Sequence, residues 1–330
     1  MNRVLAFRLL EGETQETVGK RLGISTSMVS SIEKGTRRLS VPLTPLGYRS
    51  NRFDVPPMTD PLHRQRSATR VSATNRAKEL LRLGGEVFAE LLSTQPAGPS
   101  RCLEPFAAPM TIEEIDDLAM DVRCGVLGHE AHGPIRNLTR ATELAGVCLV
   151  PIVGLDGIDG LSSWVDGQPV VGLSVSVPGD RFRFSLAHEL GHLVMHDRKN
   201  EVTEHQANRF ASSLLIPPSD LEAALPPNPT LRDFLDLKDV WGVSVAALIY
   251  KSHQLEMVDD SRYRSLQIQM SRWKRVEPGE FAPAVGGAFA RIVESRGGPD
   301  SVAADLGVNA SHLRDLTNWS PLRSLRHSAF

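Results

Sequence analysis

The feature that most constrains this chain is the run His188-Glu189-Leu190-Gly191-His192. Histidines four positions apart lie on one face of an α-helix, one turn apart, so both imidazoles can bind the same Zn²⁺ at about 2.0–2.1 Å. Glu189 projects near the same edge, where it can take a proton from a zinc-bound water. Apolar residues on both sides of the run predict a helix, and Gly191 would let another element approach closely. The run therefore predicts a metal-binding helix that carries a general base.

A second helix is expected downstream, and it offers a third metal ligand. Pro217-Pro218 would end this helix, and Glu204 stands about one turn before its apolar stripe. A catalytic zinc site needs a third protein ligand and an open fourth position, and Glu204 could supply that ligand from a helix packed antiparallel to the first. The apolar positions repeat at spacings of three and four, and they are Ala207, Phe210, Ala211, Leu214 and Leu215.

Other residues compete with Glu204 for the role of third ligand. His196 lies two turns past His188 but is rotated away from the edge that the two histidines share, which favours a packing or supporting role. His205 points about 100° away from Glu204 around its helix, so only one of the two can face the metal. Glu201 is the remaining rival. Asn208, one turn beyond Glu204, could orient a ligand or make an interhelical hydrogen bond.

The segment before the two helices is expected to form a small antiparallel sheet. Residues 147–152 and 169–177 are rich in β-branched side chains and are bounded by glycine and proline, which predicts strands. Asp156-Gly157 and Asp166-Gly167 predict tight turns. An edge strand of such a sheet could pair with an extended substrate. The expected fold class is α+β, mostly α.

These runs resemble the ImmA/IrrE family of zinc metallopeptidases. The resemblance is carried by RFRFSLAHELGH at 181–192 and by the second-helix pattern at 204–217, with looser agreement over 133–147, 160–175 and 241–248. It implies one Zn²⁺ per chain, with His188, His192 and Glu204 as metal ligands and Glu189 as the catalytic base. None of the tyrosines, Tyr48, Tyr250 and Tyr263, has a spacing that ties it to the zinc.

The amino-terminal residues 3–40 resemble a helix-turn-helix of the XRE (lambda-repressor-like) class. Thr14 would cap the second helix, Gly23 would make the turn, and residues 25–35 would hold the recognition helix and its glycine cap. A three-helix packing module with a solvated polar face is the alternative interpretation. The expected core positions are Val18, Leu22, Ile24, Val29 and Ile32.

Charge favours a contact with double-stranded DNA. Residues 1–82 contain 15 Lys and Arg against 7 Asp and Glu, so this part carries +8; because the whole chain carries −2, the remainder carries −10. A basic module on an acidic body is typical of nucleic-acid binding. Lys34, Arg37 and Arg38 suit phosphates. The side chains expected at the major groove are those of Gln15, Thr26, Ser27 and Ser30.

Composition shifts divide the chain into four parts. We expect the helix-turn-helix at 1–45, a linker with an amphipathic helix at 46–109, a peptidase domain at 110–262 and a helical carboxy-terminal segment at 263–330. Thr111 to Glu114 predicts a capping box at the start of the peptidase domain. Residues 301–313 have a helix-turn-helix rhythm, but they are interpreted as a packing unit.

Nothing in the sequence predicts a membrane association or export. No apolar run approaches the roughly 20 residues that cross a bilayer. The apolar run at the amino terminus is too short for a signal peptide, because polar residues follow it within a few positions. The cysteines, Cys102, Cys124 and Cys148, lie far apart, so neither a disulfide framework nor a cysteine-zinc site is indicated. The expected compartment is the cytoplasm.

Two functions fit these expectations. The first is a zinc endopeptidase that cleaves an XRE-type repressor in a stress or mobile-element response, as the resemblance implies. Its substrate would be the chain's own module, that of a homodimer mate, or a separate repressor. The second is a DNA-binding transcriptional regulator whose peptidase-like domain senses a ligand or metal without cleaving. Glu189 favours the endopeptidase, because Glu189 is not itself a metal ligand and a sensor that does not cleave need not keep it.

Overall fold

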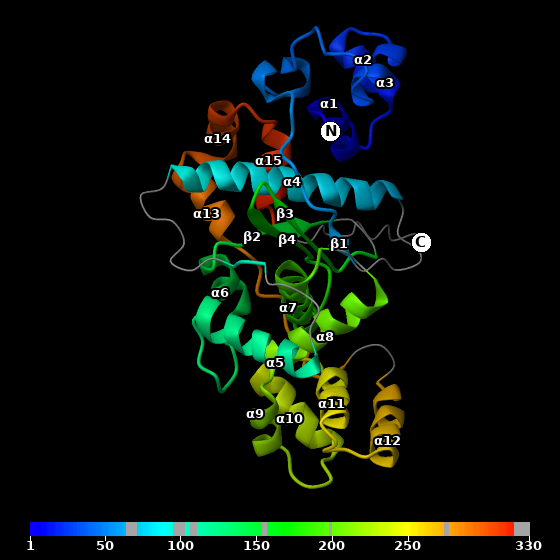
Figure 1. The fold of residues 1–330 in the computed structure, drawn as a ribbon, viewed down its shortest axis with the longest axis vertical. Coiled ribbons are helices and arrows are strands. Elements are labelled where there is room, and N and C mark those ends of the chain that lie inside the picture. Colours follow the sequence, from blue (N-terminus) through cyan, green and yellow to red (C-terminus); the bar gives the residue numbers. More distant parts are fainter. Residues whose placement is uncertain are drawn as a thin grey trace, which may run out of the picture. The chain divides into compact units, whose positions relative to one another are not determined.

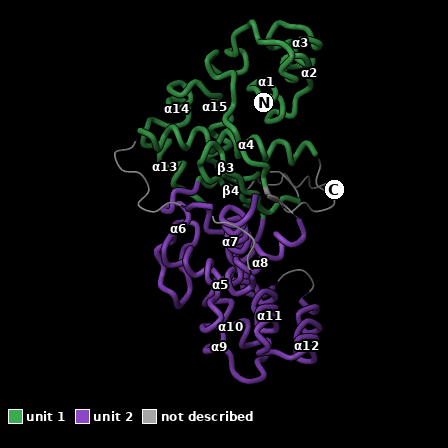
Figure 2. The backbone as a smooth tube through the Cα atoms, viewed as in Figure 1, with its two compact units in different colours: residues 1–98, 148–176, 286–330 green, residues 99–147, 177–285 purple. Residues whose placement is uncertain are grey.

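The computed structural model describes residues 1–63, 71–94, 103–105, 111–153, 157–197, 200–273 and 277–319. These residues form two compact units (Figure 2). Unit 1 comprises residues 1–98, 148–176 and 286–330, and unit 2 comprises residues 99–147 and 177–285. The expected α+β, mostly helical fold class is confirmed (Figure 1). Most of residues 93–109, the end of the expected linker, lies outside the described residues, and so does Cys102. Asp156 of the expected Asp156-Gly157 turn also lies outside them.

Unit 1 begins with a three-helix module whose helix ends follow local sequence signals. The Thr14 side chain caps α2 by accepting from the Thr17 amide, and Ser25 caps α3 by accepting from Met28. Gly23 ends α2 in the left-handed conformation. Four of the five expected core side chains are buried and Ile24 is partly buried. The helices are α1 (Arg3–Glu11), α2 (Gln15–Leu22) and α3 (Thr26–Glu33).

The sheet of unit 1 has four strands in the order β1-β3-β4-β2. The strands β3 and β4 form a hairpin around Asp166 and Gly167, whose φ angles of 48° and 81° match the tight turn expected there. The strands are β1 (Leu62–His63), β2 (Cys148–Ile152), β3 (Gly160–Val165) and β4 (Gln168–Ser174).

The expectation of a purely antiparallel sheet was wrong, because β2 and β4 are parallel. The connection after β2 reverses the chain, so that β3 runs against β2. The hairpin then reverses the chain again, and β4 lies between β3 and β2. Two reversals leave β2 and β4 running in the same direction, which no local turn signal reveals.

A long helix, α4 (Val71–Ser93), lies across this sheet (Figure 1). The amphipathic helix expected in the linker at 46–109 is α4, and two of its glycines allow α4 to approach the sheet closely. A Cβ on Gly84 would stand 2.7 Å from Val150 Cγ1, and one on Gly85 would stand 2.7 Å from Val165 Cβ. The sheet therefore packs directly on the backbone of α4.

The carboxy-terminal helices of unit 1 pack onto its amino-terminal part, as expected of a packing unit. His312 is buried, with its Nδ1 2.8 Å from Tyr48 Oη and its Nε2 2.7 Å from Glu11 Oε1. Phe289 meets Phe88 of α4 edge-on at a centroid distance of 5.5 Å. These helices are α13 (Ala288–Ser295), α14 (Gly298–Leu306) and α15 (Ala310–Thr317).

Unit 2 is built around the helix pair α7 and α8. The α5 helix starts with the expected capping box of Thr111 and Glu114. Its Asp116 accepts hydrogen bonds from Arg209 Nε at 2.8 Å and Ser213 Oγ at 2.6 Å, which ties α5 to α8. The helices are α5 (Ile112–Asp121), α6 (Leu138–Leu144), α7 (Gly179–Met195), α8 (Glu201–Leu215), α9 (Pro218–Ala224), α10 (Leu231–Trp241), α11 (Val245–Gln254) and α12 (Asp260–Ser271).

None of the helices in the described parts of the chain combines the length and the apolar character needed to cross a bilayer.

The contact between α7 and α8 depends on Gly191. A Cβ at this position would stand 2.9 Å from Phe210 Cδ1 and 3.2 Å from Phe210 Cγ. Both Gly191 and Phe210 are buried, so neither the ring nor the helix has room to move. The close approach expected at Gly191 is thus made by α8.

We predict that Gly191→Ala lowers the free energy of unfolding by about 1–3 kcal/mol, because the added methyl group overpacks this contact. Urea unfolding followed by circular dichroism measures the effect. The matched control is Gly125→Ala, since Gly125 is exposed and a Cβ there has no heavy atom within 4 Å. Equal stability of the two variants would contradict close packing at Gly191.

Candidate metal centre

Three side chains from α7 and α8 bring their donor atoms together. The ligand atoms of His188, His192 and Glu204 all lie within 4.8 Å of one another, and this is the one such group found in the described residues. His192 Nε2 is 3.2 Å from Glu204 Oε1, and His188 Nε2 is 3.8 Å from Glu204 Oε2. Both imidazoles are buried and Glu204 is partly exposed. The group is therefore enclosed on the histidine side and open on the carboxylate side.

The His188 ring is held by α8. Its Nδ1 is 3.0 Å from Asn208 Oδ1. An amide oxygen can only accept, so Nδ1 of His188 carries the hydrogen and Nε2 keeps its lone pair. Nε2 is the atom that faces Glu204. Asn208 thus makes the interhelical contact that its position one turn beyond Glu204 indicated.

The His192 ring is oriented by a chain of two hydrogen bonds. His196 Nε2 lies 3.0 Å from Gln206 Oε1, and His196 Nδ1 lies 2.9 Å from His192 Nδ1. Because the Gln206 oxygen accepts, His196 carries its hydrogen on Nε2 and accepts at Nδ1 from His192. The lone pair of His192 is then on Nε2, toward Glu204. Burial, with the neighbouring His192, lowers the pKa of His196 to about 4, so the ring is neutral near pH 7.

The donor arrangement fits a zinc ion. Two imidazole lone pairs face carboxylate oxygens at 3.2 and 3.8 Å, an arrangement that is repulsive without a cation between the donors. Donors of a tetrahedral zinc site with bonds of about 2.0–2.1 Å are separated by about 3.3 Å. Imidazole and carboxylate are also donors that zinc accepts. We therefore interpret His188, His192 and Glu204 as metal ligands.

The remaining candidates are distributed around this group. Glu189 follows His188 on α7 and is only 2% exposed, so it is buried in the protein interior. His205 and Glu201 are exposed, unlike the enclosed donor group. His196 contacts His192 rather than Glu204. Sequence reasoning missed Gln206, because nothing in its spacing from His196 indicates that the two meet.

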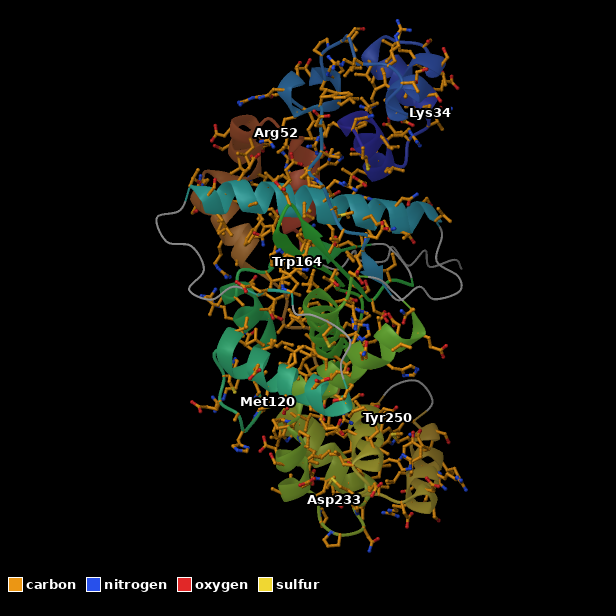
Figure 3. The ribbon with its side chains drawn as sticks, in the orientation of Figure 1. Lys34, Arg52, Met120, Trp164, Asp233 and Tyr250 are labelled. Carbon is orange, nitrogen blue, oxygen red and sulfur yellow. The ribbon has the colours of Figure 1, made fainter. Side chains whose placement is uncertain are left out.

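A cavity of about 460 Å³ in unit 2 is lined by residues of α7 and α8, although none of the three donors lines it. Asn208, which holds His188, and Phe184, one turn before His188 on α7, both line it. Ile112 and Tyr250 line it as well and are exposed (Tyr250 is labelled in Figure 3). Tyr250 thus shares a cavity with Asn208, the residue that contacts His188, which its spacing in the sequence did not indicate.

The residues expected to bind DNA lie on α2, α3 and the following turn. Thr26, Ser27, Lys34, Arg37 and Arg38 are exposed, and Lys34 is labelled in Figure 3.

Ser30 and Gln15 are partly buried. Gln15 Nε2 donates to Glu33 Oε2 at 2.8 Å, and Arg8 Nε donates to Glu33 Oε1 at 2.6 Å. Gln15 therefore already has a partner inside the module, and its role at DNA stays a prediction.

Comparison with known families agrees with both halves of the expected fusion. Residues 153–253 match the sequence model of a peptidase family described as the IrrE N-terminal-like domain. Residues 1–38 match Sigma-70, region 4, a helix-turn-helix type of domain. No curated protein matches the chain. The chain thus joins a segment similar to an IrrE-like peptidase domain to a segment similar to a helix-turn-helix type of domain, while the XRE class of the latter stays a prediction.

We predict that Glu204→Ala loses bound zinc, because the site would keep only two protein ligands. Elemental analysis of the purified full chain should give one zinc per wild-type chain and much less in the variant. His205→Ala is the matched control, since it removes a neighbouring side chain that is exposed. Unchanged zinc in Glu204→Ala, or a loss in His205→Ala, would assign the third ligand elsewhere.

We predict that Asn208→Ala weakens zinc binding by about 10–100-fold while the fold is kept, because His188 loses the group that orients its ring. Competition with a fluorescent chelator measures the affinity. Ser212→Ala, one turn further along α8, should bind zinc like the wild type. Equal affinities of the two variants would show that Asn208 does not position His188.

Proposed function

We propose that this chain is a zinc-dependent endopeptidase coupled to a DNA-binding module. The observation that carries the proposal is the convergence of His188, His192 and Glu204 beside the buried Glu189. All four residues lie within the segment that matches the IrrE N-terminal-like peptidase family. A non-cleaving metal sensor would need the metal ligands but would not need Glu189, which is expected to act as the general base.

The proposed reaction is hydrolysis of a peptide bond. Zn²⁺ held by the three ligands would lower the pKa of a water molecule and polarise the scissile carbonyl. Glu189 accepts the proton of the attacking water and passes it to the leaving amine. Asn208 and the His196–Gln206 pair keep both imidazoles in the tautomer that leaves Nε2 available.

The adjacent cavity is proposed to hold a substrate side chain. It is lined by Asn208, which contacts His188, and by Phe184, one turn before His188, and Ile112 and Tyr250 give it an apolar rim. A volume of about 460 Å³ accommodates a large apolar residue of an extended peptide. We therefore expect cleavage next to a bulky apolar residue.

The proposed substrate is an XRE-type repressor, cleaved in a stress or mobile-element response. The helix-turn-helix domain in the same chain supports this proposal, because it would bring the peptidase to DNA where such a repressor is bound. The chain's own module, or that of a partner in a homodimer, is an equivalent target. The proposed compartment is the cytoplasm, where such DNA is found.

We predict that Glu189→Gln keeps zinc and fold but loses cleavage, because an amide cannot accept the proton of water. The expected loss is about 10²-fold or more. Cleavage of a co-expressed XRE repressor, or of the chain's own module, is followed on gels, with zinc content as the control for site integrity. Absence of cleavage by zinc-loaded wild type would favour the non-cleaving sensor.

We predict salt-sensitive binding of the full chain to duplex DNA. Lys34→Gln, Arg37→Gln and Arg38→Gln should each remove one charge that neutralises a phosphate, and each should therefore reduce the slope of log K against log salt by about 0.9. Thr26→Ala and Ser27→Ala should weaken binding to one sequence and leave non-specific binding nearly unchanged. Half-sites about one helical turn apart would indicate a dimer.

Fluorescence anisotropy over a salt series measures these slopes. Arg264→Gln is the control, because Arg264 is exposed on α12 of unit 2. Salt-independent binding, or none, would make the amino-terminal module a protein-docking domain.

A further inference from the structure

Unit 2 contains a second cavity, which the proposed reaction does not use. Its volume is about 560 Å³, and it is lined by the first turns of α7, the end of α10, residues 134–139 and residues 281–284. None of the metal ligands lines it. Arg183 of α7 lines it, five positions before His188 on the same helix.

The charge of Arg183 is not balanced by any acidic side chain among the described residues. Its Nη2 donates to the carbonyl oxygen of Ile135, whereas its enclosed Nε has no acceptor among the described residues. It forms no ion pair with any acidic side chain that the structure describes. Burial, together with the like charge of Arg123, lowers the pKa of Arg183 to about 10.

The neighbouring acids do not neutralise Arg183. Asp180 and Glu277 both accept from the buried Lys238, at 2.7 and 3.1 Å. Asp239 lines the cavity but is exposed, as is Arg136. The cavity therefore has two guanidinium groups against one solvated carboxylate.

The other walls are apolar and partly open to solvent. Phe281 is 42% exposed and Val240 is 58% exposed, and both line the cavity with the indole of Trp241. Exposed aromatic and branched side chains around an uncompensated cation suit a molecule with a charged end and an apolar body.

We propose that this cavity binds a small organic carboxylate, whose charged end pairs with Arg183 and whose apolar body lies against Phe281 and Trp241. A guanidinium group carries five N–H donors in a planar fork that matches a carboxylate. Only one hydrogen bond of Arg183 is made to the described protein, so donors remain for the ligand. A carboxylate also supplies the opposite charge that a desolvated arginine requires. The site does not depend on the proposed peptidase reaction.

The test uses the full chain and two probes of the same shape, 2-naphthoate and its neutral amide, 2-naphthamide. Isothermal titration calorimetry should show naphthoate binding at least about tenfold more tightly than naphthamide, as a hydrogen-bonded charge pair provides. The preference should disappear in Arg183→Met and persist in Arg232→Gln, whose side chain is 80% exposed on α10.

A second pair of surface variants keeps the test valid if Arg183→Met does not fold. Asp239→Asn removes the one carboxylate of the cavity and should strengthen naphthoate binding without changing naphthamide binding. Phe281→Ala should weaken both probes equally, because it removes a contact to the ring. Equal affinity of the wild type for the two probes, no binding of naphthoate at millimolar concentration, or no effect of Asp239→Asn would overturn the proposal.

Discussion

The contact of Gly191 with Phe210 is the constraint on which the site depends. With no Cβ at position 191, the ring of Phe210 packs against the backbone of α7, and α8 lies close enough for its side chains to meet those of α7. Glu204, Gln206 and Asn208 all reach α7 from that helix. One close helix contact therefore brings the Glu204 carboxylate to the two histidines, together with the two groups that orient their rings.

Electrostatics then accounts for the donor geometry. Each histidine of the HELGH run gives its Nδ1 hydrogen to a neighbour, so each keeps a lone pair on Nε2 beside the Glu204 carboxylate. Two imidazole lone pairs and a carboxylate suit a bound metal cation, and the family match supports a metallopeptidase. Arg183, five positions before His188 on α7, shows the opposite imbalance, because it is a cation without an anionic partner among the described residues.

The parts of this structure that follow from local spacing could be predicted from the sequence. The caps at Thr14 and Thr111, the turn at Asp166 and the pairing of His188 with His192 each involve residues within a few positions of one another. Parallel pairing of β2 with β4 and the contact of His196 with Gln206 could not be predicted, because they depend on which elements meet. The approach of Glu204 to the two histidines could be predicted, because both its spacing and the family resemblance indicated it.

X-ray absorption at the zinc edge of the zinc-loaded full chain identifies the atoms bound to the metal. The proposed site predicts two imidazole nitrogens and one carboxylate, with water in the open position, all at about 2.0–2.2 Å, and no sulfur at about 2.3 Å. Loss of one oxygen scatterer in Glu204→Ala, with both imidazole signals kept, would match the assigned ligands. A spectrum with sulfur ligands, or with fewer than two imidazoles in the wild type, would contradict the site.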